Sequence, residues 1–201
     1  KLSSIFLKRK NNRMIKKILT VSGIAIFCLH FGQLSKVKEL NKIYQKQNEQ
    51  ISAKYKLTYP LERIREEDEN NTQRLDGYEE AIKNIQKKEV PYNSSSVLPD
   101  ATKEAEFESG INGFRTLIAN NFDTSAISNT QQGTVKTMVS FLIDEKGKVS
   151  QVKAEGTSRE FNLLTIITLY DVAEKGNWKP ADHNGIAVKS VFTLPVVMQF
   201  E

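Results

Sequence analysis

The feature that most constrains this sequence is a strict alternation of side chains over residues 134–143. In an extended chain, two sets of side chains would point to opposite sides: Thr137, Val139, Phe141 and Ile143 to one side, and Lys136, Met138 and Ser140 to the other. A period of two is typical of a β-strand with one buried face. The chain must therefore build a sheet and cover one side of it.

Two further strands are predicted after this one. Asp144-Glu-Lys-Gly147 forms a hairpin connection with glycine where a positive φ is needed, and a second strand follows over residues 149–154. Residues 188–200 are rich in β-branched and aromatic side chains and predict the final strand. Pro195 within it cannot donate a ladder hydrogen bond, which indicates an edge strand or a bulge. A long exposed edge often has a partner.

Two amphipathic helices are predicted beside these strands. The first runs from Phe107 to Phe122, with apolar residues three and four positions apart. The second follows Ser158, a candidate N-cap, and runs from Phe161 to Ala173 before a basic last turn and a glycine at Lys175-Gly176. The sequence therefore predicts an α+β fold, in which a three-stranded antiparallel sheet packs against two helices.

Several stretches after residue 104 share the order and spacing of one known domain. They are Ala105–Arg115, Gly133 before the first strand, Phe141–Val149, Asn177-Trp-Lys-Pro-Ala181, Asn184-Gly185 and Phe192-Thr-Leu-Pro195. Together they resemble the C-terminal domain of the TonB family, the energy transducers of Gram-negative bacteria. The resemblance runs in register over about half of the chain, which makes it more specific than any single motif.

The resemblance implies a binding module. TonB-like domains add a short extended segment of an outer-membrane receptor to the edge of their sheet, where main-chain hydrogen bonds give affinity and side-chain pockets give specificity. The family contacts its receptor through a Tyr-Pro pair before the first strand, and the corresponding residues here are Asn121 and Phe122, without the proline. The implied binding edge consists of residues at the start of the last strand: Val188, Ser190, Phe192 and Leu194.

Three residues of the resembling stretches have structural roles. Trp178 is expected to hold the second helix against the sheet, and Pro180 to stop that helix from continuing. Gly185, with the asparagine before it, is expected to make the turn into the last strand.

A basic head and an apolar run occupy residues 1–33. Seven lysines and arginines but no acidic residue lie in residues 1–17, and the fourteen residues from Ile18 to Phe31 carry no charge. This order is typical of a secretory signal peptide, with cleavage expected near Gly32. As a helix the run spans about 21 Å, short of the roughly 30 Å hydrocarbon core, and a retained membrane anchor is the alternative. Met14 makes a more natural start than the first residue.

Between the head and the domain, residues 34–90 predict a polar helical spacer. Its apolar residues recur at helical spacing, but the stripe is narrow, and Pro60 interrupts it before a second helix. The spacer is either a coil that binds a partner or a solvated helix pair without a specific one. Residues 91–104 are polar and turn-forming, and they predict a linker to the domain of residues 105–201.

The distribution of charge and of reactive side chains excludes other classes of function. The net charge is +5, and the seven positive charges of the head leave −2 on the rest of the chain, so no basic face for phosphate is predicted. His30 lies in the apolar run and His183 in a polar turn, and no phosphate loop or nucleophile elbow accompanies them. Cys28, the only cysteine, lies in the apolar run. We therefore expect no enzyme activity, cofactor or metal site.

The resemblance to the TonB family, together with the predicted export signal, implies a periplasmic TonB-like protein of a Gram-negative bacterium. Its partners would be outer-membrane TonB-dependent receptors, in the uptake of siderophores or nutrients. If the apolar segment stays in the membrane, inner-membrane motor proteins become partners as well, and the chain becomes a transducer of force. The alternative is an envelope scaffold that has the same fold, binds another partner and has no energy-transducing role.

Overall fold

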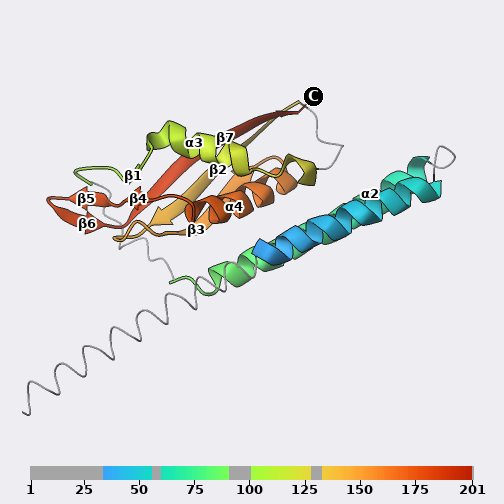
Figure 1. Cartoon of the computed structure of the whole chain (residues 1–201), viewed down its shortest axis with the longest axis horizontal. Coiled ribbons are helices and arrows are strands. Elements are labelled where there is room, and N and C mark those ends of the chain that lie inside the picture. The colour runs from blue at the N-terminus through green and yellow to red at the C-terminus, as the bar shows by residue number, and fades with distance from the viewer. Residues whose placement is uncertain (1–33, 56–59, 91–100, 128–132, 201) are drawn as a thin grey trace, which may run out of the picture.

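The computed structural model describes residues 34–55, 60–90, 101–127 and 133–200. These residues form a mixed α+β structure, in which a sheet with helices on one face lies beside a long helical hairpin (Figure 1). The coarse fold class predicted from the sequence is confirmed. The predicted signal peptide or anchor and residues 91–100 of the predicted linker lie outside the described residues.

The central sheet has three antiparallel strands in the order β3-β2-β7. They are β2 (Gly133–Ile143), β3 (Val149–Gly156) and β7 (Ser190–Phe200). The central strand β2 pairs Val139 with Leu194 of β7, and it pairs Ile143 with Val149 of β3. The alternation over residues 134–143 is therefore confirmed as a strand, and β7 lies at an edge, as Pro195 indicated. β7 begins at Ser190, two residues later than predicted, because Val188 belongs to a separate short strand.

The predicted turn between β2 and β3 is confirmed. Gly147 adopts a φ of 78°, and Asp144 Oδ1 accepts hydrogen bonds from the backbone nitrogens of Lys146 and Lys148 at 2.9 and 2.8 Å. Further along β3, the register shifts opposite the segment between Ser140 and Leu142, and Gln151 has a φ of 54°. The extra residue is a β-bulge that bends this strand.

Helices α3 (Gly110–Asn121) and α4 (Arg159–Ala173) cover one face of the sheet. The predicted cap of α4 is confirmed, because the Ser158 side chain accepts a hydrogen bond from Phe161 N at 3.2 Å. The prediction of a helix from Phe107 was wrong. Phe107 pairs with Trp178 across two short strands, β1 (Glu106–Phe107) and β4 (Trp178–Lys179), and the helix begins only at Gly110.

A second, smaller hairpin joins β5 (Ala181–His183) to β6 (Ile186–Val188). Gly185 makes its turn, with a φ of 85° and a backbone nitrogen that donates to Asp182 Oδ1 at 2.8 Å. This turn joins β5 to β6, and β7 follows β6. Lys103 pairs with Asp182, so the ordered domain extends into the stretch predicted as a linker.

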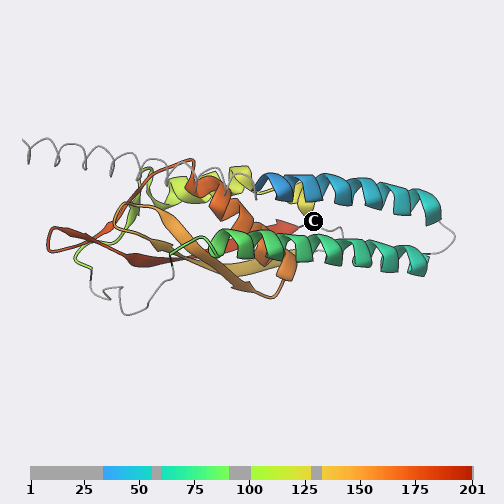
Figure 2. The same ribbon diagram turned by 90° about the horizontal axis from the view of Figure 1, so that it is seen from below.

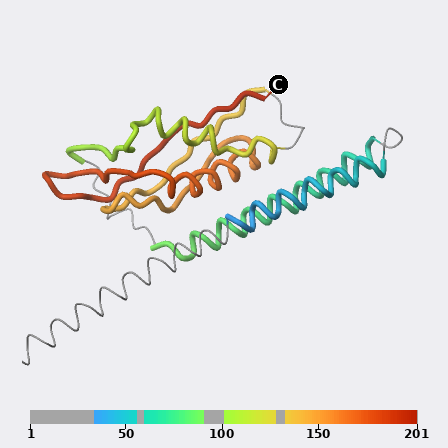
Figure 3. The backbone as a smooth tube through the Cα atoms, in the orientation of Figure 1, coloured from blue at the N-terminus to red at the C-terminus, as the bar shows by residue number. Residues whose placement is uncertain are grey.

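The spacer forms a helical hairpin. Residues 34–55 are helical, and α2 (Pro60–Gln86) runs back along them (Figures 2 and 3). Proline is tolerated at the first position of a helix because that position needs no hydrogen-bond donor, so Pro60 begins α2. Tyr78, whose side chain is fully buried, donates its hydroxyl to Asn41 Oδ1 across the hairpin, and its burial raises the pKa of the phenol.

The hairpin is docked on the domain, so one side of the helix pair is not solvated, and a separate partner for it stays a prediction. The C-terminal half of α2 buries Tyr78, Ala81, Ile82 and Ile85 in the same core as the sheet. Arg159 of α4 forms ion pairs with Asp76 and Glu79 of α2 at 2.7 and 2.9 Å. The other half of the hairpin projects beyond the sheet (Figure 2).

Candidate functional site: the groove at the β7 edge

The two edges of the sheet differ in how they are protected. At the bulge of β3, Gln151 N donates to Glu89 Oε2 at 2.8 Å, and Gln86 Nε2 donates to Val152 O at 2.8 Å. Val152 N in turn donates to the Tyr170 hydroxyl at 3.3 Å. Side chains thus occupy backbone groups that an added strand would need on β3.

The outer edge of β7 is not paired with any strand that the structure describes. Among the described residues, β7 pairs only with β2. Because proline has no N–H for the ladder, Pro195 takes a position whose backbone faces away from β2. Backbone direction alternates along an antiparallel strand, so Thr193 and Val197 share the outward orientation of Pro195. The outer side of β7 therefore presents peptide groups for pairing, with one donor missing at Pro195.

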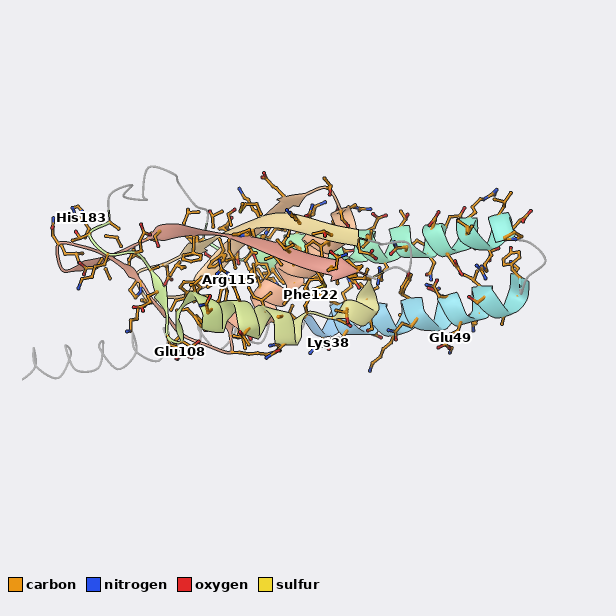
Figure 4. The ribbon with its side chains drawn as sticks, turned by 90° about the horizontal axis from the view of Figure 1, so that it is seen from above. Lys38, Glu49, Glu108, Arg115, Phe122 and His183 are labelled. Atoms are coloured by element: carbon orange, nitrogen blue, oxygen red, sulfur yellow. The ribbon has the colours of Figure 1, made fainter. Side chains whose placement is uncertain are left out.

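A groove of about 330 Å³ follows this edge between α3 and β7. Figure 4 shows the two elements side by side, with Arg115 labelled on α3 and Phe122 directly after its end. The lining residues come from both elements: Arg115, Ile118, Ala119 and Phe122 from the helix and its end, and Leu194, Pro195, Val196, Val197 and Met198 from the strand. The groove thus runs parallel to the peptide groups that β7 presents.

The walls of the groove are apolar and its rim carries one cation. Phe122 and Leu194 are buried, and the Phe122 ring packs on that of Phe161 with centroids 5.4 Å apart. The Arg115 side chain is exposed, and its guanidinium donates a long hydrogen bond, of 3.3 Å, to Asn112 Oδ1 on the same helix. The arrangement suits an apolar side chain inside the groove and a carboxylate beside Arg115.

The structure divides the residues predicted for the binding edge. Leu194 and Phe122 come together as lining residues of one groove. Phe192 is half-buried against the core, with its ring 5.5 Å from that of Phe141 and 4.8 Å from that of Trp178. Ser190 is half-buried at the start of β7, and Val188 lies on β6. Even-numbered side chains of β7 thus face the core and odd-numbered ones face outward.

Asn121 of the predicted contact loop has an intramolecular role. Its Nδ2 donates to Leu117 O at 2.8 Å, and its Oδ1 accepts from Lys175 Nζ at 2.5 Å. Both bonds fix the end of α3 beside Phe122.

Several lining residues were not predicted from the sequence: Arg115, Ala119, Val196, Val197 and Met198. The alternation rule, applied to residues 188–200 as it was to residues 134–143, places Val196 and Met198 on the same face as Leu194 and could have found them. Arg115 and Ala119 lie on α3, and the strand β7 that faces them follows about eighty residues later in the sequence. No local sequence pattern therefore indicates that they line a groove.

Trp178 has a structural role, and its ring contacts involve α3. Its ring lies 5.4 Å from Phe107, 5.0 Å from Phe114 and 5.5 Å from Phe141. Trp178 therefore joins α3 and β1 to the sheet, whereas α4 was the expected contact. Pro180 separates β4 from β5, after α4 has already ended.

No family model, curated protein or solved structure matches this chain. The resemblance to the TonB C-terminal domain therefore stays a prediction from its residues. Within residues 34–55, 60–90, 101–127 and 133–200, no helix combines the length and the apolar character needed to cross a membrane.

Proposed function

We propose that this chain is a non-catalytic binding module of the bacterial envelope, which takes an extended segment of an outer-membrane receptor onto the β7 edge. One observation carries the proposal: an apolar groove runs along the strand edge that no described strand covers. Strand addition needs both features, since the edge supplies main-chain hydrogen bonds and the groove supplies side-chain contacts.

The sequence resemblance supports the receptor as the partner. TonB-like domains bind at the edge formed by their last strand, and the last strand of this chain is an edge strand. The other edge, at β3, is obstructed by Glu89, Gln86 and Tyr170. The two observations together favour β7 as the binding strand.

The groove also defines the chemistry of the segment that it accepts. A fourth strand would pair with the outward peptide groups of Thr193 and Val197 and receive no donor from Pro195. Its inward side chains would meet Ile118, Ala119 and Phe122, so at least one of them is apolar. A carboxylate near the same position would pair with Arg115. The ligand is therefore an extended peptide that combines an apolar with an acidic side chain.

A binding measurement with a matched pair of variants tests this proposal. The probes are synthetic peptides of about ten residues, copied from the N-terminal segments of outer-membrane receptors of the same organism and followed by fluorescence anisotropy. Ala119→Trp fills the groove and is expected to weaken binding at least about tenfold, as for the loss of one buried apolar side chain. Asn120→Trp is the control, because Asn120 is the next residue, is exposed and does not line the groove. This variant is expected to leave binding unchanged.

Two results would count against the proposal. If Ala119→Trp and Asn120→Trp bind a receptor peptide equally well, the groove is not its site. If none of the receptor peptides binds the unaltered chain, the scaffold alternative with a different envelope partner is favoured.

A further inference from the structure

The segment after Phe122 is held by side chains from the helical hairpin. Asn41 Nδ2 donates to Asp123 Oδ2 at 3.0 Å, and Gln45 Nε2 donates to Ser125 Oγ at 3.4 Å. Both donors lie on the helix of residues 34–55, far away in sequence. The hairpin therefore contacts the loop that begins at the Phe122 wall of the groove.

Arg74 of α2 holds the same segment through its backbone. The guanidinium donates to Ala126 O and forms an ion pair with Glu160, and the two side chains are only 1% and 7% exposed. It also stacks over the Tyr44 ring, 3.8 Å from the centroid. A buried charge that loses its partner is strongly destabilising, so Arg74 fixes the hairpin, the loop and α4 to one another.

The position of Phe122 is set by two groups of these contacts. It directly precedes residues 123–126, which the hairpin binds, and its ring packs on Phe161, the residue after Glu160. Phe122 is also a wall of the groove. The contacts that dock the hairpin therefore also define the shape of the proposed peptide site.

We infer that Asn41 and Arg74 are positioning residues of the peptide site, which hold the Phe122 wall in place through the docked hairpin. The inference rests on the proposed function, because it names what regulates that same groove. A hairpin displaced from the domain releases the wall and lowers the affinity for the peptide. By linkage, a bound peptide stabilises the docked hairpin by the same factor.

The test compares variants of the whole chain by two independent readouts. Asn41→Ser combined with Gln45→Ala removes both side-chain bonds from the first helix to the loop, and Arg74→Lys alters the contact with Ala126. Arg159→Ala is the control, since it breaks the exposed ion pairs between α4 and α2 without touching residues 122–126. The readouts are amide hydrogen exchange at residues 122–127 without peptide, and affinity for the receptor peptide.

Both hairpin variants are expected to speed exchange at residues 122–127 and to weaken peptide binding by about fivefold or more, the lower end of measured coupling between sites. The control is expected to change neither by more than about twofold. In the unaltered chain, the peptide should slow exchange at residues 41–45. The slowing demonstrates coupling to the hairpin when it exceeds that of residues that exchange by global unfolding, which any ligand of the folded state slows.

The possible failures can be told apart. If exchange at residues 122–127 and peptide affinity are both unchanged in the Asn41→Ser/Gln45→Ala chain, the inference is overturned, even where Arg74→Lys does not fold. If the unaltered chain binds no peptide, the proposed function fails, and the exchange data alone decide whether the hairpin holds the wall.

Discussion

The guanidinium of Arg74 and the carboxylate of Glu160 form a buried ion pair where the hairpin contacts α4. Burying two charges costs several kcal/mol for each ion, and their attraction offsets this only when the remaining hydrogen-bonding capacity is also used. Asn71 Oδ1 accepts from Arg74 at 2.6 Å, and Glu160 lies in the first turn of α4, where the helix dipole favours a carboxylate. The pair therefore defines how the hairpin docks more than it adds to stability.

This balance predicts the result of replacing one partner or both. Glu160→Ala leaves the Arg74 charge buried and should lower the free energy of unfolding by about 3–5 kcal/mol. Arg74→Met combined with Glu160→Leu removes both charges and should recover most of that loss. Urea unfolding of the three chains measures it. A double variant as unstable as the single one would contradict this account.

The sequence could predict the Ser158 cap but not the ion pair of Glu160. The cap is a local pattern at a helix start, and its prediction holds because the hydrogen bond spans only three residues. Arg74 resembles any other charged residue of a polar helix. Its role depends on an ion pair that spans 86 positions, which is information that only the tertiary structure contains.

The projecting half of the hairpin is held by exposed polar contacts. Lys54 Nζ lies 2.6 Å from Glu66 Oε1, and the Tyr55 hydroxyl donates to the same oxygen at 2.5 Å. The hydrogen bonds from Lys54 and Tyr55 hold the pKa of the Glu66 carboxyl below its usual range, and the bond to Glu66 raises the pKa of Lys54 to about 12. The contact therefore depends on pH at both ends.

The direction of each shift sets the pH window of this contact. The folded pKa of Glu66 is lowered, so its contribution is complete above about pH 4.3 and is lost as the pH falls through the folded value. Lys54 is raised, so its contribution is complete below about pH 10.4 and is lost at higher pH. Protection factors at residues 50–55 should therefore decrease between pH 7 and pH 3 in the unaltered chain.

Glu66→Gln is the control for this prediction. Glutamine does not titrate, so the loss of protection between pH 7 and pH 3 should be smaller in that variant. Equal losses in the two chains would show that Glu66 does not control the end of the hairpin.

The sheet and its two helices were predictable from the sequence because local patterns encode them. Alternation marks β2, a glycine marks the turn at Gly147, and a cap marks α4. The docking of the spacer was not predictable from the sequence. Tyr78 and Ile82 belong to an apolar stripe that is too narrow to indicate a buried helix face, and the stripe is buried only because the domain packs against it. Phe107 was misassigned for a related reason: its apolar side chain fits a helical period, yet it packs on Trp178.

The proposed location in the envelope predicts how the chain is processed in cells. Fractionation should place the protein in the periplasm, and the intact mass should correspond to cleavage near Gly32. A mass that retains residues 14–33 would contradict cleavage and favour the anchored form, with inner-membrane motor proteins as further partners.

The missing donor at Pro195 has a consequence for how copies of this chain behave towards one another. An uninterrupted outer edge would be a template for stacking copies into growing sheets, the route to fibres and precipitates. Pro195 divides the edge into two short runs of peptide groups. These runs are long enough to pair with a short peptide segment but unfavourable for self-assembly. Pro195→Val should therefore increase light scattering in concentrated solution, whereas Val197→Thr should not. The pyrrolidine ring of Pro195 would thus limit pairing between the β7 edges of different copies.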